Sequence, residues 1–448
     1  MKRYNYILLS LLFIVSACDI PEQVNPNNPS LSSILTGATN TDLSNLVIGS
    51  LANMREEHNT YVASAGTIPR ELYLFDADPR NRTDLVGVGV DQLDNNSFYT
   101  TRPWLERYKT IKNLNILLEA LEQADESVSD AQKLGYEGFA NTLIAHQFLL
   151  MILYHGENGI RLDVSDPDNL GPIETETAVY SEIMLLLDNA VAPLNTGEFA
   201  FTFTTGFDGF DTPADFLTFN RALAAKTELM RGNYQAALDA LPSSFFDLNG
   251  DLTVGPKMSY STSGADILNE LFKAPQQSGD QLIVNDNWIL DAEPGDLRVA
   301  NKAAMRDNPT SSSGFNGTHE TRLYSSSTDP IDIIRNEELV LIYAEANIGL
   351  GGAGLADAVS AIDVIRISAG LNDLATDKPT LDQGSASELL DEMLHQRRYS
   401  FWGEGQRMFD LRRYDRLNET YVTLDVLSDP DDNADQQIFQ AFPVPLTE

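Results

Sequence analysis

Apolar residues recur at helical spacing along most of this chain, and no other feature of the sequence constrains the fold as strongly. One apolar stripe covers residues 216–230 and ends at Gly232, after which a second short helix is expected over 236–241. A similar pair is expected over 335–348 and 355–368, on either side of a glycine cluster. Short helices joined by small-residue turns are typical of tetratricopeptide units.

No strict repeat of about 34 residues is visible, so we expect degenerate helix pairs. Further helices are expected over 42–57, 104–123, 139–154 and 177–194. The segment 139–154 is apolar on nearly every side, yet too short and too polar for a membrane span, which favours a buried central helix. The sequence therefore predicts a mainly all-α fold, with residues 36–448 forming one large domain.

Three long stretches, 61–103, 202–213 and 248–330, lack a clear period and are rich in Gly, Asn, Asp, Ser and aromatic residues. Irregular segments of this length inside a compact body are usually functional or disordered. Their aromatic content favours an ordered, functional role.

Cys18 is the only cysteine in the chain, and it follows a basic start and an apolar run over residues 7–15. This pattern predicts a lipoprotein signal over 1–17, with a lipidated Cys18 and an extended tether over 18–35. The alternatives are an ordinary signal peptide with a chance cysteine, or a membrane span, for which the run falls short of about 20 residues. A single cysteine excludes internal disulfides and cysteine metal sites, so packing must supply the stability.

The formal net charge of −36 argues against nucleic acid as a partner, because binding to phosphates needs clustered Lys and Arg. It also argues against adsorption on anionic lipid, so contact with a membrane is expected through the lipid anchor only.

Four sequence blocks of the C-terminal third occur in a recognisable order. They are RNEELVLIYAEA (335–346), IDVIR with AGL (362–371), QRRYSFWGEGQRMFDLRR (396–413) and FPVP (442–445). In this order and spacing the blocks resemble the SusD/RagB family of outer-membrane lipoproteins. Residues 145–156 and the Asn/Pro-rich tether are similar too. The sequence departs from the family at Gln396 and Ser400, where glutamate is usual, so local charge pairing there must differ.

The resemblance implies tetratricopeptide-like helix pairs that support an irregular ligand-binding part. It implies a surface-exposed lipoprotein of a Gram-negative outer membrane. Such a protein would cap a SusC-like TonB-dependent transporter and deliver oligosaccharides, or in some members peptides, to it. No binding residue of the family can be carried over, because the irregular middle of the chain matches none of its motifs.

Several charged groups of the C-terminal third are candidates for chemistry. Glu338 and Glu345 share a helix face, but we expect them to be structural carboxylates with arginine partners such as Arg397 or Arg407. The six arginines between 397 and 416 are expected to pair with Glu404, Asp410 and these two glutamates rather than form an anion site.

Acidic clusters at 163–168 and 429–435 do not have the spacing of a calcium loop, and the five histidines form no ligand-spaced group. We therefore expect no catalytic residues, no metal and no cofactor.

Sugar binders stack the apolar faces of rings on aromatic side chains and bracket the hydroxyls with polar groups. Two irregular stretches supply this mixture, and they give the candidate ligand-binding residues Tyr73, Phe75, Tyr99, Trp104, Trp288 and Tyr324. Trp288 and Tyr99 are the first choices, whereas Trp402 is expected in the core. The leading hypothesis is a non-enzymatic glycan-binding lipoprotein. The alternatives are a tetratricopeptide-like scaffold for proteins or peptides and a surface glycoside hydrolase.

Overall fold

The computed structural model describes residues 34–166, 169–203, 205–264, 266–425, 427 and 435–446. The predicted signal peptide, Cys18 and nearly all of the tether lie outside the described residues.

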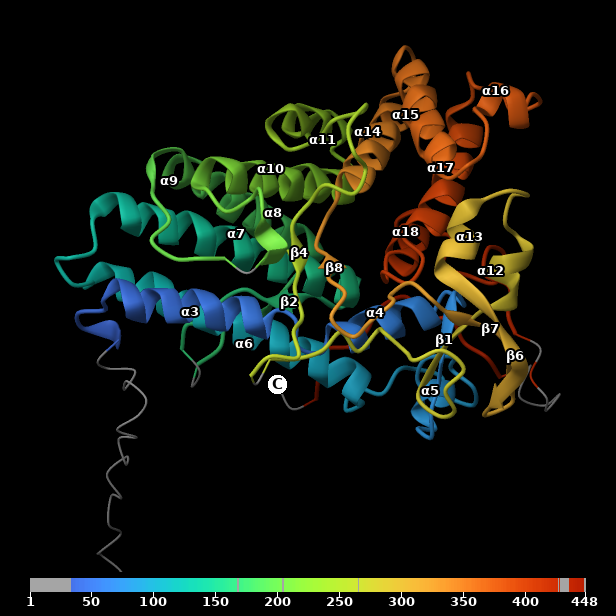
Figure 1. The fold of residues 1–448 in the computed structure, drawn as a ribbon, viewed down its shortest axis with the longest axis horizontal. Coiled ribbons are helices and arrows are strands. Elements are labelled where there is room, and N and C mark those ends of the chain that lie inside the picture. Colours follow the sequence, from blue (N-terminus) through green and yellow to red (C-terminus); the bar gives the residue numbers. More distant parts are fainter. Residues whose placement is uncertain are drawn as a thin grey trace, which may run out of the picture.

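The N-terminal half is a layered stack of helices (Figure 1). Helices α3 (Asn40–Asn53), α6 (Phe98–Glu122) and α7 (Asp130–His155) pack in that order, and α8 (Glu176–Asn189) and α9 (Val191–Thr196) cover α7. Capping boxes begin two of them, because Thr39 and Ser129 each accept from a backbone N–H of the first turn and bond reciprocally with Asp42 and Gln132.

Helix α7 is the buried central helix that the sequence predicts. Nearly every side chain from Tyr136 to His155 is buried, including Phe139, Leu143 and Phe148. Within the described part of the chain, no helix combines the length and apolar character needed to cross a bilayer.

Helix α6 begins at Phe98, six residues before the predicted start at Trp104, because Pro103 lies inside the helix and not in front of it. A proline inside a helix lacks the N–H that would bond to the carbonyl four residues earlier. Here that carbonyl belongs to Tyr99, and it accepts instead from the Tyr154 hydroxyl of α7 at 2.8 Å. This tertiary contact compensates for the missing donor, so the first turn of α6 carries Phe98, Tyr99 and Arg102.

The predicted helix pairs are present. Helix α10 (Pro213–Met230) turns at Gly232 into α11 (Tyr234–Ala240), and α14 (Asn336–Leu350) turns at a glycine cluster into α15 (Gly354–Ser368). Gly232, Gly351 and Gly352 have φ values of +75°, +68° and +61°, which residues with a Cβ rarely adopt. Helices α16 (Leu374–Asp377), α17 (Ala386–Ser400) and α18 (Arg407–Arg413) complete this C-terminal part, in which α14 packs on α11 and α17.

Two of the three irregular stretches contribute strands to a small sheet that the sequence analysis does not predict. Its antiparallel order is β1 (Leu72–Phe75), β5 (Gln281–Val284), β7 (Phe315–Thr321) and β6 (Ala303–Ser312). The sheet lies at the opposite end of the molecule from α9, beside α4 (His58–Thr67), α5 (Arg80–Thr83), α12 (Asp286–Leu290) and α13 (Leu297–Lys302) (Figure 1). The partners β1 and β5 are about 210 residues apart in sequence, so no local pattern reveals their pairing.

The remaining elements are short. Strand β2 (Ile160–Arg161) pairs with β3 (Ile173–Glu174), and β4 (Lys257–Met258) pairs with β8 (Ile331–Asp332). Single 3-10 turns occupy Gly156–Asn158, Thr205–Phe207 and Leu241–Ser243. The fold is mainly helical, as predicted.

Candidate ligand-binding cleft

The two glutamates of α14 are structural, but their partners differ from the expected ones. Glu338 forms an ion pair with Lys226 at 2.7 Å, and Glu345 accepts from Arg413 and from the Tyr414 hydroxyl. Arg397, the partner suggested by the sequence, pairs with Asp410 at 2.8 Å instead. Both glutamates are buried, so each needs such a partner to remain charged.

Each of the six arginines between 397 and 416 binds to other groups of the protein. Four form ion pairs with described carboxylates, namely Arg397, Arg398, Arg413 and Arg416. The other two, Arg407 and Arg412, donate to backbone carbonyls. Glu404, expected to pair within this group, contacts Arg335 at 2.6 Å instead.

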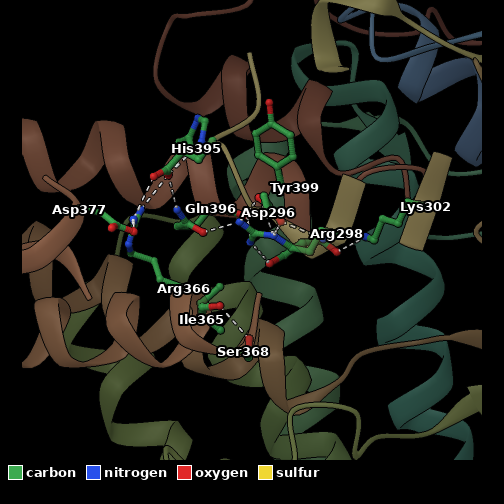
Figure 2. A network of polar contacts seen from close by, with 12 residues as sticks. Asp296, Arg298, Lys302, Ile365, Arg366, Ser368, Asp377, His395, Gln396 and Tyr399 are labelled. Atoms are coloured by element: carbon green, nitrogen blue, oxygen red, sulfur yellow. Dashed lines mark hydrogen bonds and ion pairs between the residues drawn. The ribbon is translucent and has the colours of Figure 1, made fainter. Parts of the chain in front are cut away.

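The two departures from the family pattern lie in one polar network (Figure 2). Arg298 donates to the Gln396 side chain at 2.6 Å and to the Ser400 hydroxyl at 3.1 Å, while its charge pairs with Asp296 at 2.7 Å. Neutral residues at 396 and 400 therefore supply acceptors, and Asp296 supplies the counter-charge.

Neither acidic cluster forms a metal site within the described residues. The Asp163 carboxylate accepts from the Ser165 hydroxyl at 2.7 Å, as expected for a turn in a loop. Asp168 and most of the second cluster lie outside the described residues.

Four of the six candidate aromatic residues belong to the packed interior. Trp288 is fully buried, with ring centroids 5.1 Å from Tyr399 and 4.8 Å from Trp402. Trp104 packs edge-on to His155. Tyr73 and Phe75 pack under the sheet in a small apolar cluster with Ile283 and Phe315, among others. These four side chains fill space between elements, so we do not carry them into the candidate site.

The other two candidates, Tyr99 and Tyr324, each line a hollow of the structure. Tyr99 is almost completely buried, and its hydroxyl donates to Asn81. Burial raises the pKa of both tyrosines, so both hydroxyls are protonated at neutral pH.

The hollow beside Tyr99 is an open cleft of about 450 Å³ between α4, the end of β1, the first turn of α6 and the irregular segment 268–280. We call it the cleft. Its apolar lining comes from Leu74, Phe98, Tyr99, Leu268 and Phe272, and its polar lining includes Asn59, Asp76, Arg102, Glu270, Lys273 and Asp280. Polar residues outnumber apolar ones in the lining, so the cleft joins an apolar wall to a largely polar rim.

Phe98 is the half-buried aromatic of this wall, and two guanidinium groups stack on its ring. The Cζ atoms of Arg80 and Arg102 lie 4.3 and 4.9 Å from the ring centroid. Arg80 forms a close ion pair with Asp78 at 2.6 Å. Arg102 is more than half exposed, and its ion pair with Glu57 is longer, at 3.5 Å. The guanidinium group of Arg102 can therefore turn toward a ligand.

The rim of the cleft carries paired donors and acceptors. Asn59 donates to Glu270 at 2.7 Å, and Lys273 donates to Asp280 at 2.7 Å. Because Glu270 and Asp280 are exposed, these bonds exchange with water or ligand groups at little cost.

One buried side chain fixes the segment that forms the far wall. Asn269 donates to the Asp329 carbonyl at 2.9 Å, its backbone N–H donates to the Ser327 carbonyl at 2.8 Å, and its side-chain oxygen accepts from the N–H of Leu271. Irregular backbone without a sheet or helix needs such bonds to hold one conformation. Asn269 thus positions Leu268 and Phe272 at the cleft.

Sequence reasoning named the stretch that contains Phe98 but chose Tyr99 from it. The two side chains point about 100° apart on the helix, and packing leaves Phe98 half-buried and Tyr99 almost completely buried. No local signal indicates that Phe272 and Asn269 belong to the same site.

Comparison with known proteins relates the C-terminal third of the chain to one family. Residues 303–445 match the SusD family, described as SusD_RagB. The C-terminal third of this chain is therefore similar to the SusD/RagB family.

Solved structures of SusD superfamily proteins share the fold of this chain over most of its length. A SusD superfamily protein from Bacteroides thetaiotaomicron is 16% identical, with a TM-score of 0.67 over 91% of this chain and 97% of its own. Surface glycan-binding protein A from Bacteroides uniformis is 17% identical, with a TM-score of 0.64 over 88% and 95%. The protein of the same name from Bacteroides thetaiotaomicron is 15% identical, with a TM-score of 0.66 over 91% and 96%. A comparison with curated proteins finds no match to this sequence.

Proposed function

We propose that this protein is a cell-surface glycan-binding lipoprotein, and that the cleft is where it holds an oligosaccharide. The observation that carries the proposal is the combination of an apolar wall, formed by Phe98, Leu268 and Phe272, with charged and amide groups on an open rim. Sugar rings offer apolar C–H faces and many hydroxyls, and this cleft has a group to contact each.

The size and charge of the cleft fit this class of ligand. Its volume of about 450 Å³ lies within the range of small-molecule sites, roughly 300–1,000 Å³. Its opening to solvent suits a chain molecule that continues beyond the site. Three carboxylates, Asp76, Glu270 and Asp280, face two cations, Arg102 and Lys273, so a neutral ligand is favoured over a strongly charged one.

Two solved proteins that share this fold are named surface glycan-binding protein A, which supports the same class of ligand here. The candidate residues Tyr99 and Tyr324 enter the proposal differently. Tyr99 supports the floor of the cleft, while Tyr324 lines a separate hollow.

The proposed place of action follows from the N-terminus and the family. Lipidation at Cys18 would tether the protein to the outer membrane, and residues 18–35 would leave the body room to move. A SusC-like TonB-dependent transporter is the proposed partner that receives the oligosaccharide. A transporter gene next to the gene for this protein, and co-purification of the two products, would support this pairing.

Replacing Phe98 with alanine should weaken oligosaccharide binding about tenfold, equivalent to about 1.4 kcal/mol, because the ring supplies the apolar wall. The measurement is isothermal titration calorimetry against a panel of oligosaccharides and peptides. The ligand itself is chosen from the panel with the unaltered protein.

The matched control is Leu105→Ala, an exposed position further along α6 and outside the cleft, which should leave affinity unchanged. Binding of peptides but no glycan would favour the scaffold alternative. Release of shortened sugars from the panel would instead indicate a hydrolase.

Replacing Cys18 with serine should abolish incorporation of labelled fatty acid and move the protein from the membrane fraction to the soluble fraction. The thiol is the only possible acceptor for a thioether-linked lipid, because the chain has no other cysteine. Persistent membrane association of the Cys18→Ser protein in high salt would contradict the anchor. Protease shaving of intact cells reports whether the body faces outward.

A further inference from the structure

A smaller hollow adjoins the cleft on the side of α4, and we call it the side hollow. It has a volume of about 70 Å³, and its walls come mainly from residues 55–59 and from residues 260 and 267–270. Three side chains, Asn59, Leu268 and Glu270, line both the side hollow and the cleft. The two hollows are therefore neighbouring parts of one groove between α4 and the irregular segment.

The boundary between the two hollows consists of groups that a ligand can reach. The Asn59 amide donates to the Glu270 carboxylate at 2.7 Å and so joins α4 to the irregular segment. Glu270 is exposed, so this bond exchanges with a ligand hydroxyl at little cost. Leu268 is 42% exposed and adds an apolar contact beside the polar one.

Glu57 connects the two hollows a second time. It lines the side hollow, and its Oε1 lies 3.5 Å from the guanidinium of Arg102, which lines the cleft. Its φ of +54° is a left-handed conformation that residues with a Cβ rarely adopt, and Oε2 accepts from the Thr60 hydroxyl at 2.6 Å. Strained backbone of this kind is concentrated at ligand sites, which supports a functional role for this turn.

The charge and size of the side hollow restrict what can enter it. Three glutamates line it, Glu56, Glu57 and Glu270, while the one cation among the described lining residues, Arg55, is already paired with Asp266 at 2.6 Å. An acidic group would be repelled, whereas a hydroxyl can donate to a carboxylate. The volume, about twice that of a water molecule in the liquid, admits a substituent of a sugar ring but not the ring itself.

We propose that the ligand of the cleft is an uncharged oligosaccharide whose chain continues over Leu268 and places one hydroxyl-bearing substituent in the side hollow. The bond between Asn59 and Glu270 opens as the chain crosses, and both groups then bond to ligand hydroxyls. This inference rests on the proposed function and adds to it a ligand that is longer than the cleft.

The test titrates malto-, cello- and xylo-oligosaccharides into the full chain by calorimetry, from the monosaccharide to the tetrasaccharide of each series. In a series that binds, affinity should rise at least tenfold with length. Ile267→Trp, which fills the side hollow, should remove most of this gain and leave affinity for the shortest bound member unchanged. The control Leu105→Trp places the same ring at an exposed position of α6 outside the groove and should preserve the gain.

The combination of variant and ligand length separates this proposal from the proposed function. Binding whose affinity does not rise with length, or an equal effect of Ile267→Trp on short and long members, overturns this proposal alone. Tighter binding of oligogalacturonates than of every neutral series also overturns it. If no series binds, this proposal fails, and the proposed function fails with it only if the wider glycan panel does not bind either. Should Ile267→Trp not fold cooperatively, Glu56→Trp fills the side hollow from the turn before α4.

Discussion

Replacing Arg366 with methionine should lower the free energy of unfolding by about 3–5 kcal/mol, because removing one partner of a buried ion pair leaves the other charge uncompensated. Arg366 is fully buried and contacts three carboxylates, Glu293 at 2.8 Å, Glu392 at 2.7 Å and Asp377 at 3.0 Å. Figure 2 shows Arg366 between Asp377 and the neighbouring network around Gln396. Urea unfolding followed by circular dichroism measures the change.

A matched control is Lys109→Met, which removes an exposed ion pair with Glu106 on α6. Exposed pairs contribute about 0–1 kcal/mol, so its unfolding curve should nearly overlay that of the unaltered protein. Equal losses of unfolding free energy in the two variants would show that the ion pairs of Arg366 do not stabilise the fold more than an exposed pair does.

The cluster should also make stability depend on pH. Hydrogen bonds and charges from His395, Arg366 and Lys378 outweigh the opposing effect of burial and hold the pKa of Glu293 well below its usual range. A carboxyl whose pKa is lowered in the folded state stabilises the fold fully above its unfolded pKa of about 4.3. This stabilisation is lost as the pH falls from that value toward the lower pKa of the folded state. Arg366→Met should weaken this acid sensitivity.

Replacing Trp288 with alanine should cost about 3–5 kcal/mol of unfolding free energy, because it empties a large buried volume. The ring packs at a tilt against Tyr399 and Trp402, and the backbone carbonyl of Trp288 accepts from the Tyr399 hydroxyl at 3.0 Å. The same measurement in urea applies, with glycan affinity measured in parallel.

Leu290→Ala is the control in the same helix, since Leu290 is 77% exposed and its removal should change stability by less than about 0.5 kcal/mol. A Trp288→Ala protein that keeps its stability but loses glycan binding would return this residue to the ligand site and contradict the packing seen here.

Particular elements show how far sequence reasoning reaches. The spacing of apolar residues predicts α7 as a buried helix, and the glycines after α10 and α14 predict where these helices end, since both signals are local. The same reasoning starts α6 only after Pro103, because the hydroxyl that replaces the missing N–H comes from Tyr154, about 50 residues away. It also leaves out β1 and β5, whose pairing joins two irregular stretches.

The candidate site follows the same division. Composition alone identifies the stretches that hold the cleft residues, but it cannot tell Phe98, which faces the cleft, from Trp288, which is fully buried. Which aromatic faces a ligand depends on the packing of neighbouring segments, here α4, α6 and the irregular segment held by Asn269.

By itself, the sequence determined the helical class, the paired helices and the C-terminal blocks that match the SusD family, because each is written in short spacings or short motifs. Only the tertiary structure decided the small sheet, the partners of the buried charges and the walls of the cleft. These depend on contacts between residues far apart in the chain, and the sequence records such residues without recording which of them meet.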